Sequence, residues 1–186
     1  MQKLVTLFIL FRTMMAICIF AVGETALAEG QSVTIFKLTD RPEQGGIGEA
    51  KGTITLEDTP HGLKFTVNLT GLPPGEHGFH VHEHGSCASM LKDGKMTLGA
   101  GAGDHYDPNN TDSHKGPYST KGHLGDLPIL LVDENGNSRL AIVAPRLKRS
   151  QIQGRTIIIH QNSDNYLDYP NPLGGGGPRI ACGIIK

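Results

Sequence analysis

The stretch GFHVHEHGSC, residues 78–87, holds three of the nine histidines and one of the three cysteines of this 186-residue chain. In an extended strand, successive side chains point to opposite faces. His80, His82 and His84 would therefore share one face, while the apolar residues on either side of His80 would point into a core. Histidines at alternate positions also occur on solvated strand faces, so this pattern alone leaves metal binding and a plain surface strand equally open.

Short segments on both sides of this stretch also predict strands, because they are apolar or alternate with a period of two. The expected strands are 32–38, 48–56, 63–69, the histidine stretch, 128–132, 139–143, 156–160 and 179–185. The sequence DENGN at 133–137 is typical of a hairpin turn. Eight short strands without a convincing helix predict an all-β fold, an antiparallel Greek-key barrel or sandwich with long functional loops.

One connection, residues 86–127, lacks apolar periodicity and far exceeds the usual length of about 4 to 6 residues. Disorder is one explanation, and a functional loop held in place by a bound metal ion is the other. The loop contains His105, His114 and His123, with Asp126 three residues after the last. Three imidazoles and a carboxylate are the ligand types of a tetrahedral zinc site.

Further imidazoles come from His80, His82 and His160, the last at the end of an apolar strand. All-imidazole coordination with a tetragonal preference suits copper, which changes oxidation state where zinc cannot. The sequence therefore predicts two metals of different character.

The first 28 residues have the three regions of a secretory signal peptide. Lys3 and Arg12 are followed by the apolar run 14–22 and by the small-residue ending Ala26-Leu27-Ala28. The apolar run is shorter than the roughly 20 residues that span a bilayer. We therefore expect export, cleavage after Ala28 and no stable membrane anchor.

The expected mature domain, 29–186, carries 15 Lys and Arg against 17 Asp and Glu. This nearly neutral balance argues against nucleic-acid binding by bulk charge, so any attraction for an anion must be local. Its length suits a single domain. The two remaining cysteines, Cys87 and Cys182, predict a disulfide in an oxidising compartment, with two free buried thiols as the alternative.

Four segments together resemble the copper/zinc superoxide dismutases: GFHVH (78–82), AGDHYDP (102–108), GHLGDL (122–127) and GPRIACG (177–183). The resemblance extends over essentially the whole expected mature domain. It implies a flattened Greek-key β-barrel that converts superoxide to oxygen and hydrogen peroxide as an antioxidant defence outside the cytoplasm. The long loop at 89–101 resembles the exported bacterial class, which implies a periplasmic enzyme. A homodimer is expected, with a monomer as the alternative.

Motif by motif, the resemblance implies the copper ligands His80, His82, His105 and His160 and the zinc ligands His105, His114, His123 and Asp126. His105 belongs to both sets because the bridging imidazole of the family links the two metals through its two ring nitrogens. In the family, one superoxide reduces copper and a second reoxidises it, while the bridge leaves copper and takes up a proton. Zinc orients the bridge and shapes the loop.

Two further residues have expected roles beside these ligands. Asp164 matches the family's carboxylate that hydrogen-bonds one copper-ligating and one zinc-ligating histidine, and an ordinary loop aspartate is the alternative. Arg179 lies three residues before Cys182, whose expected partner Cys87 follows His82 by five residues. The disulfide would therefore hold this guanidinium near the copper, where it would attract and orient a small anion.

The remaining histidines are not expected to bind metal. His77 fits a hydrogen-bonded framework position, His61 an exposed turn, and His84 the solvent-facing end of its strand. We also hypothesise that Lys92 and Lys95 steer superoxide by local positive charge, with plain solvation as the alternative.

The glycine run 174–177 resembles a phosphate-binding loop only superficially, since no Lys-Ser/Thr pair follows it. It is interpreted as chain flexibility or as a close approach of the backbone to another group. Neither interpretation assigns it a ligand.

Overall fold

The computed structural model describes residues 30–41, 45–92 and 94–186, so the expected signal peptide, 1–28, lies outside the described residues. The strands are β1 (Gln31–Leu38), β2 (Ile47–Thr59), β3 (Gly62–Leu69), β4 (Gly75–His77), β5 (Phe79–His82), β6 (Met90–Lys92), β7 (Lys95–Thr97), β8 (Leu130–Val132), β9 (Ala141–Ala144), β10 (Thr156–His160) and β11 (Arg179–Ile184). The described residues include three short 3-10 helices, η2 (Ala100–Ala102), η3 (Arg149–Gln151) and η4 (Leu173–Gly175). None of the described helices is long and apolar enough to cross a membrane.

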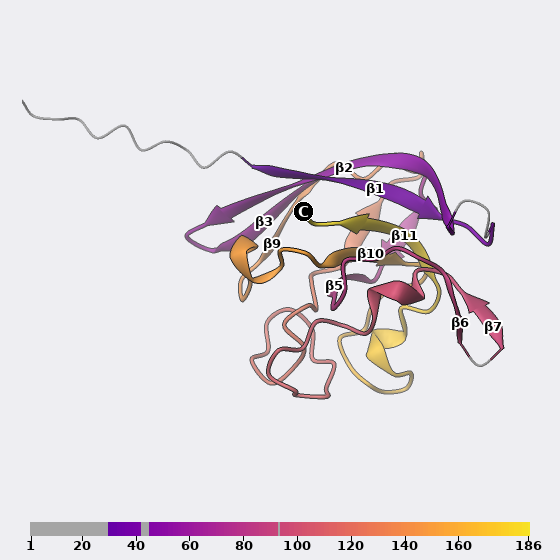
Figure 1. The fold of residues 1–186 in the computed structure, drawn as a ribbon. Helices are drawn as coiled ribbons and strands as arrows, with labels where there is room; N and C mark the ends of the chain where they lie inside the picture. Colours follow the sequence, from indigo (N-terminus) through magenta and orange to yellow (C-terminus); the bar gives the residue numbers. More distant parts are fainter. Residues whose placement is uncertain (1–29, 42–44, 93) are drawn as a thin grey trace, which may run out of the picture.

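Seven strands form one antiparallel sheet in the order β5-β10-β11-β1-β2-β3-β9, and this sheet curls into a half-barrel (Figure 1). The all-β prediction is confirmed. The long connections that follow β7 and β10 lie together below the sheet in this view. Strand β10 pairs with β5 on one side and with β11 on the other, where His160 lies opposite Arg179. The ends of these three strands therefore bring histidines and an arginine from distant parts of the chain to one place.

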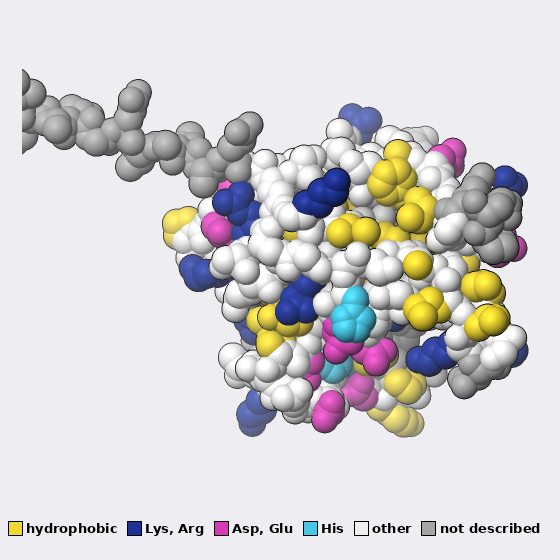
Figure 2. Space-filling model, in the orientation of Figure 1, with side chains coloured by type: hydrophobic (Ala, Val, Ile, Leu, Met, Phe, Trp, Pro, Cys, Tyr) yellow, Lys and Arg dark blue, Asp and Glu magenta, His cyan; other side chains and the backbone are white. Residues whose placement is uncertain are grey.

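A small hairpin, β6–β7, interrupts the connection that the sequence predicted to be without regular structure. Its strands have three residues each, and Met90, Leu91 and Met96 are exposed. Figure 2 shows hydrophobic side chains at the edge of the molecule where Figure 1 places the hairpin. Lys92 and Lys95 are exposed and form its last residue pair. Their steering role stays a prediction.

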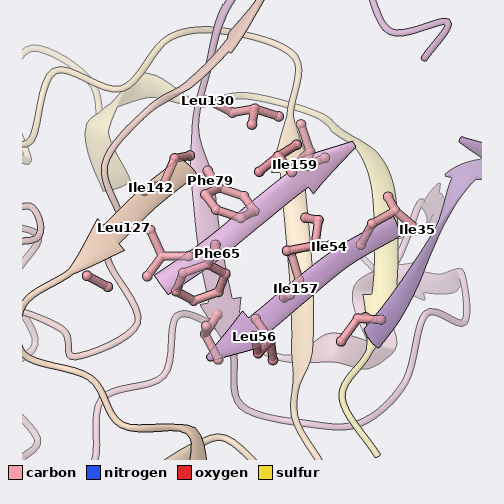
Figure 3. Packing of buried hydrophobic residues seen from close by; sticks show 14 of the residues in the cluster. Ile35, Ile54, Leu56, Phe65, Phe79, Leu127, Leu130, Ile142, Ile157 and Ile159 are labelled. Carbon is pink, nitrogen blue, oxygen red and sulfur yellow. The ribbon is translucent and has the colours of Figure 1, made fainter. Parts of the chain in front are cut away.

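The core fills the half-barrel with the inward-facing residues of each strand. In β3, Leu63, Phe65, Val67 and Leu69 are buried, as the period of two predicts. The ring of Phe65 meets that of Phe79 edge to face, with centroids 5.6 Å apart (Figure 3). Burying a side chain of this size stabilises the fold by about 1.5–3 kcal/mol, so the core provides a rigid support for β5 and its histidines.

The turn predicted at Asp133–Asn137 forms, but the prediction that it joins the two strands of a hairpin is wrong. Asp133 N–H donates to the Asn137 carbonyl at 2.8 Å and Gly136 N–H to the Asp133 carbonyl at 2.9 Å. The flanking strands then separate, because β8 pairs with β4 whereas β9 pairs with β3. Ser138 already bridges to Leu69 of β3. The turn is therefore a corner between two sheets.

Candidate metal centre

The ends of strands β5 and β10 place three histidines side by side. His80 and His82 alternate along β5, and His160 is the last residue of β10. The long loop is joined to β5 through isolated backbone bridges, which pair His82 with His105 and His80 with Asp126. Sequence alternation thus explains the first pair of histidines, and backbone pairing brings the loop residues to them.

The first of the two groups consists only of imidazoles. His80, His82, His105 and His160 are buried, and one ring nitrogen of each lies within 4.8 Å of the others. The rings of His80 and His105 are the closest pair of rings in this group, with centroids 4.0 Å apart. Four buried imidazoles around one point are a donor set that suits copper.

Hydrogen bonds fix which ring nitrogen faces the centre of this group. His82 Nδ1–H donates to the Gly103 carbonyl and His160 Nδ1–H to the Gly177 carbonyl, both at 3.0 Å. The opposite atoms, Nε2 of His82 and His160 and Nδ1 of His80, are buried without a hydrogen-bond partner among the described residues. Leaving a buried polar atom unpaired costs about 1–3 kcal/mol, so these three nitrogens fit a metal ion.

The second group surrounds one carboxylate oxygen. Asp126 Oδ1 lies 3.0 Å from His105 Nδ1, 3.1 Å from His114 Nδ1 and 3.4 Å from His123 Nδ1. The Nδ1 atoms of His114 and His123 are also buried without a hydrogen-bond partner among the described residues. Three imidazoles and one carboxylate match the ligands of a tetrahedral zinc site, and His105 belongs to both groups.

Asp164 connects the two groups from behind. Its carboxylate accepts hydrogen bonds from His80 Nε2 at 2.7 Å, from His114 Nε2 at 2.8 Å and from the Tyr166 backbone N–H at 2.7 Å. Gly174 packs against it with φ +72°, where a Cβ atom would come within 1.9 Å of Asp164 Oδ1. The glycine run therefore allows a close backbone approach, one of its two interpretations from the sequence.

Arg179 is fixed next to the all-imidazole group. Its Nη1 donates to the Gly99 carbonyl and its Nη2 to the Gly103 carbonyl, each at 2.6 Å. Gly103 O is also the acceptor for His82 Nδ1–H. The guanidinium is only partly buried, so its charge remains available to an anion.

The disulfide supports this arrangement. Cys87 and Cys182 are bonded and buried, with their Cα atoms 5.8 Å apart. Around them Leu38, Ala102 and Ile158 form a second small core. The bond ties the segment after β5 to β11, three residues beyond Arg179.

Known proteins identify the family. The sequence model of one protein family, the copper/zinc superoxide dismutases, matches residues 50–185, which is most of the chain. The chain belongs to the copper/zinc superoxide dismutase family. It is therefore an oxidoreductase of the superoxide dismutase type, and the cofactors of its family are copper and zinc.

Relatives of this superoxide dismutase match most of its length. A Cu-Zn superoxide dismutase of Escherichia coli is 44% identical over 94% of this chain and 99% of its own. One from Salmonella typhimurium is 50% identical over 76% of this chain and 82% of its own. The solved Cu/Zn superoxide dismutase from Brucella abortus has a TM-score of 0.80 at 45% identity, covering 85% of this chain and all of that one.

Burial keeps the copper-suited imidazoles of the enzyme neutral. Burial lowers the pKa of His80, His82 and His105, and it lowers the pKa of His160 to about 4. The neighbouring histidines add to this effect. Neutral rings keep a lone pair on the nitrogen that lacks a hydrogen-bond partner, which is the form that binds a metal.

The zinc-suited group behaves differently because two carboxylates contact one ring. Burial opposes a charge on His114, but its hydrogen bond to Asp164 and the negative charge of Asp126, 3.1 Å from Nδ1, raise its pKa to about 9. Burial likewise opposes the charges of these two carboxylates, yet their histidine partners hold the pKa of both well below the usual range. At neutral pH, the His114 ring of the metal-free group therefore carries a second proton and a positive charge.

Zinc uptake should release that proton. Because His114 must be deprotonated to bind a metal, the apparent zinc affinity should rise about tenfold per pH unit between pH 7 and 9. Titration of the metal-free protein with Zn²⁺ in a weakly buffered solution containing a pH indicator would count the released protons. An affinity that does not change with pH, together with no released proton at pH 7, would contradict the expectation.

The structure keeps the other histidines out of both groups. His77 is buried, with its ring nitrogens 2.8 Å from the carbonyl oxygens of His160 and Pro73, as expected of a framework residue. His61 is exposed in a turn. Strand β5 ends at His82, and the side chain of His84 beyond it is 67% exposed. The strand, and with it the alternation of side chains, therefore ends at His82, two residues before His84.

Acidic side chains gather beside the zinc-suited group. A cavity of about 360 Å³ is lined by His105, His123, Glu83, Asp104, Asp107, Asp112 and Asp168, together with Asn110 and Leu173. Figure 2 shows acidic side chains next to a histidine on this face. Like charges repel, so an anion is disfavoured in this cavity and favoured at Arg179.

The sequence did not reveal several residues that orient the ligands. The carbonyls of Gly103 and Gly177 hold two rings, and Asp168 Oδ2 accepts the His114 backbone N–H at 2.9 Å. Any residue offers a backbone carbonyl, so such partners leave no side-chain signal. The only sequence signal for Asp168 is its position as a second aspartate, four residues after Asp164.

Proposed function

We propose that the enzyme dismutates superoxide at a copper ion linked through His105 to a zinc ion. The copper ligands would be His80, His82, His105 and His160, and the zinc ligands His105, His114, His123 and Asp126. The observation that carries this proposal is the set of five buried ring nitrogens without hydrogen-bond partners among the described residues. They fall into two groups of matching donor chemistry, and those groups share one histidine.

The histidines and Arg179 have distinct tasks in this reaction. Copper, when bound, would supply the one-electron redox chemistry of both half-reactions. His105 offers Nδ1 to the zinc group, which leaves Nε2 for the copper group. This Nε2 atom would hold one of the two protons that convert superoxide into hydrogen peroxide. Asp164 keeps the rings of His80 and His114 oriented throughout.

Arg179 would attract and orient the anionic substrate. A hydrogen bond to a charged group contributes about 1.5–3 kcal/mol, so we expect Arg179→Gln to lower kcat/KM at least about tenfold. Arg179→Lys keeps the charge but not the planar pair of donors, and should give an intermediate rate. Stopped-flow assays at low ionic strength, with metal content checked, measure both. A wild-type rate for Arg179→Gln would exclude this role.

Reconstitution of the full mature protein tests the function itself. After addition of both ions, we expect one copper and one zinc per chain and rapid loss of superoxide. A metal-binding or metal-delivering protein on the same barrel would bind both ions without turnover. Normal occupancy without superoxide removal would therefore refute the enzymatic proposal, and copper uptake without zinc would indicate a copper-only relative.

We also propose that residues 1–28 are a signal peptide, that residues 29–186 are the mature enzyme, and that it protects the periplasm from superoxide. The charged, apolar and small-residue regions before Glu29 support export. The disulfide supports an oxidising compartment. Protein recovered from the periplasmic fraction should begin at Glu29; recovery of the intact chain from the cytoplasm would contradict export.

The oligomeric state stays a prediction of a homodimer, with a monomer as the alternative. A solved relative from Salmonella enterica is described as monomeric, and it is 45% identical, with a TM-score of 0.74, over 84% of this chain and 99% of its own. Sedimentation of the metal-loaded protein distinguishes the two states.

A further inference from the structure

Arg146 holds the long loop through backbone carbonyls, one of which belongs to His123. It lies two residues after β9, at the end of the barrel, and is partly buried. Its guanidinium donates to four backbone carbonyls of the loop: Nε to Pro117 at 2.9 Å, Nη1 to Gly122 at 3.2 Å, and Nη2 to Gly116 at 3.3 Å and to His123. No side chain of the loop takes part in these bonds.

The four carbonyls belong to two arms of one lobe. Residues 116–117 and 122–123 are buried, whereas 118–121 between them form the mostly exposed tip, with Tyr118 71% exposed. Buried carbonyls require hydrogen-bond partners. Arg146 provides these from the barrel side and so keeps the two arms together.

Each arm leads directly to zinc-suited ligands. The first arm follows His114, and its Gly116 N–H donates to Asp126 Oδ2 at 3.2 Å. The second arm carries His123, whose backbone N–H donates to the Ser113 carbonyl at 3.0 Å. The spacing of the arms therefore sets the spacing of the side chains of His114, His123 and Asp126.

We propose that Arg146 is a positioning residue that presets the zinc group before the ion binds, an inference that rests on the proposed zinc role of that group. One planar guanidinium reaches four acceptors in fixed directions. A lysine ammonium has three donors on a flexible stem, and a glutamine amide has two. Neither can hold both arms in the same geometry.

Zinc affinity of the metal-stripped, disulfide-intact chain tests this role. We expect Arg146→Gln to weaken Zn²⁺ binding about 10- to 100-fold, as for other residues that orient metal ligands. Arg146→Lys should show a smaller loss. Arg139→Gln is the matched control, because Arg139 is exposed just before β9. Competition with a chromogenic chelator gives the affinities, and the absorption spectrum of Co²⁺ in the zinc group reports its geometry.

Hydrogen exchange separates positioning from general stability. In Arg146→Gln, the amides of 113–123 should exchange faster without metal, while those of β3 and β10 keep their protection. Unchanged zinc affinity and Co²⁺ spectrum in both Arg146 variants would overturn the inference. Equal losses of barrel protection and of copper and zinc affinity would also overturn it. Failure of the wild-type chain to bind zinc would instead refute the proposed function.

Discussion

Replacement of His160 by alanine should lower the rate of superoxide removal about a thousandfold or more, equivalent to at least about 4 kcal/mol of barrier. His160 belongs to the all-imidazole group alone, and its Nε2 is one of the buried nitrogens without a hydrogen-bond partner among the described residues. Its Nδ1–H donates to the Gly177 carbonyl. The substitution therefore removes a proposed copper ligand that does not belong to the zinc-suited group.

The assay must compare metal content as well as rate. In His160→Ala, the Co²⁺ spectrum of the zinc-suited group should resemble that of the wild-type protein, while copper binding weakens. His84→Ala is the matched control from the opening stretch, because its side chain is exposed beyond the end of β5. Full activity of His160→Ala, or an equal loss in His84→Ala, would contradict the assignment.

Removal of the disulfide should have the largest effect on stability. Cys87 and Cys182 are 95 residues apart in the sequence, and closing a loop of that length stabilises the fold by about 4–5 kcal/mol in the chain-entropy model. The double variant Cys87→Ser/Cys182→Ser should therefore lose a free energy of unfolding of this order. Urea denaturation of the metal-free proteins measures it.

Chemical reduction supplies the control for this comparison. The wild-type protein in excess reductant should unfold at the same urea concentration as the double serine variant. If the free energies of unfolding of oxidised and reduced protein differ by less than about 1 kcal/mol, the crosslink does not reduce the conformational entropy of the unfolded chain as the chain-entropy model assumes. The reduced protein should also lose activity, because the bond ties β11 and Arg179 to the segment after β5.

Side-chain pattern predicted much of the barrel and the composition of the centre. Alternation in Leu63–Leu69 shows which face is buried, and the same rule aligns His80 with His82. It also nominated His84, which lies beyond the strand end. Alternation cannot indicate where a strand stops, since that depends on backbone pairing with β10.

The features that sequence reasoning did not find depend on backbone groups or on tertiary partners. The β6–β7 hairpin buries neither face, so it has no apolar periodicity. The turn at 133–137 has the residue types of a hairpin turn, but packing in the core determines which strands pair on either side of it. Arg146 binds only carbonyls, which every residue type provides. Pattern thus predicts the ligand types, and packing determines their orientation.

The carbonyl of Gly103 accepts hydrogen bonds from both Arg179 and His82. A carbonyl oxygen has two lone pairs, and the strength of one bond affects the other. Hydrogen bonding to a ligating histidine also tunes the basicity of its ring. With Arg179 and His82 in their proposed roles, we therefore expect substrate affinity and the reduction potential of copper to be coupled. We expect a variant selected for tighter anion binding through Arg179 to show a shifted copper potential as well, which would limit how far either property can be engineered alone.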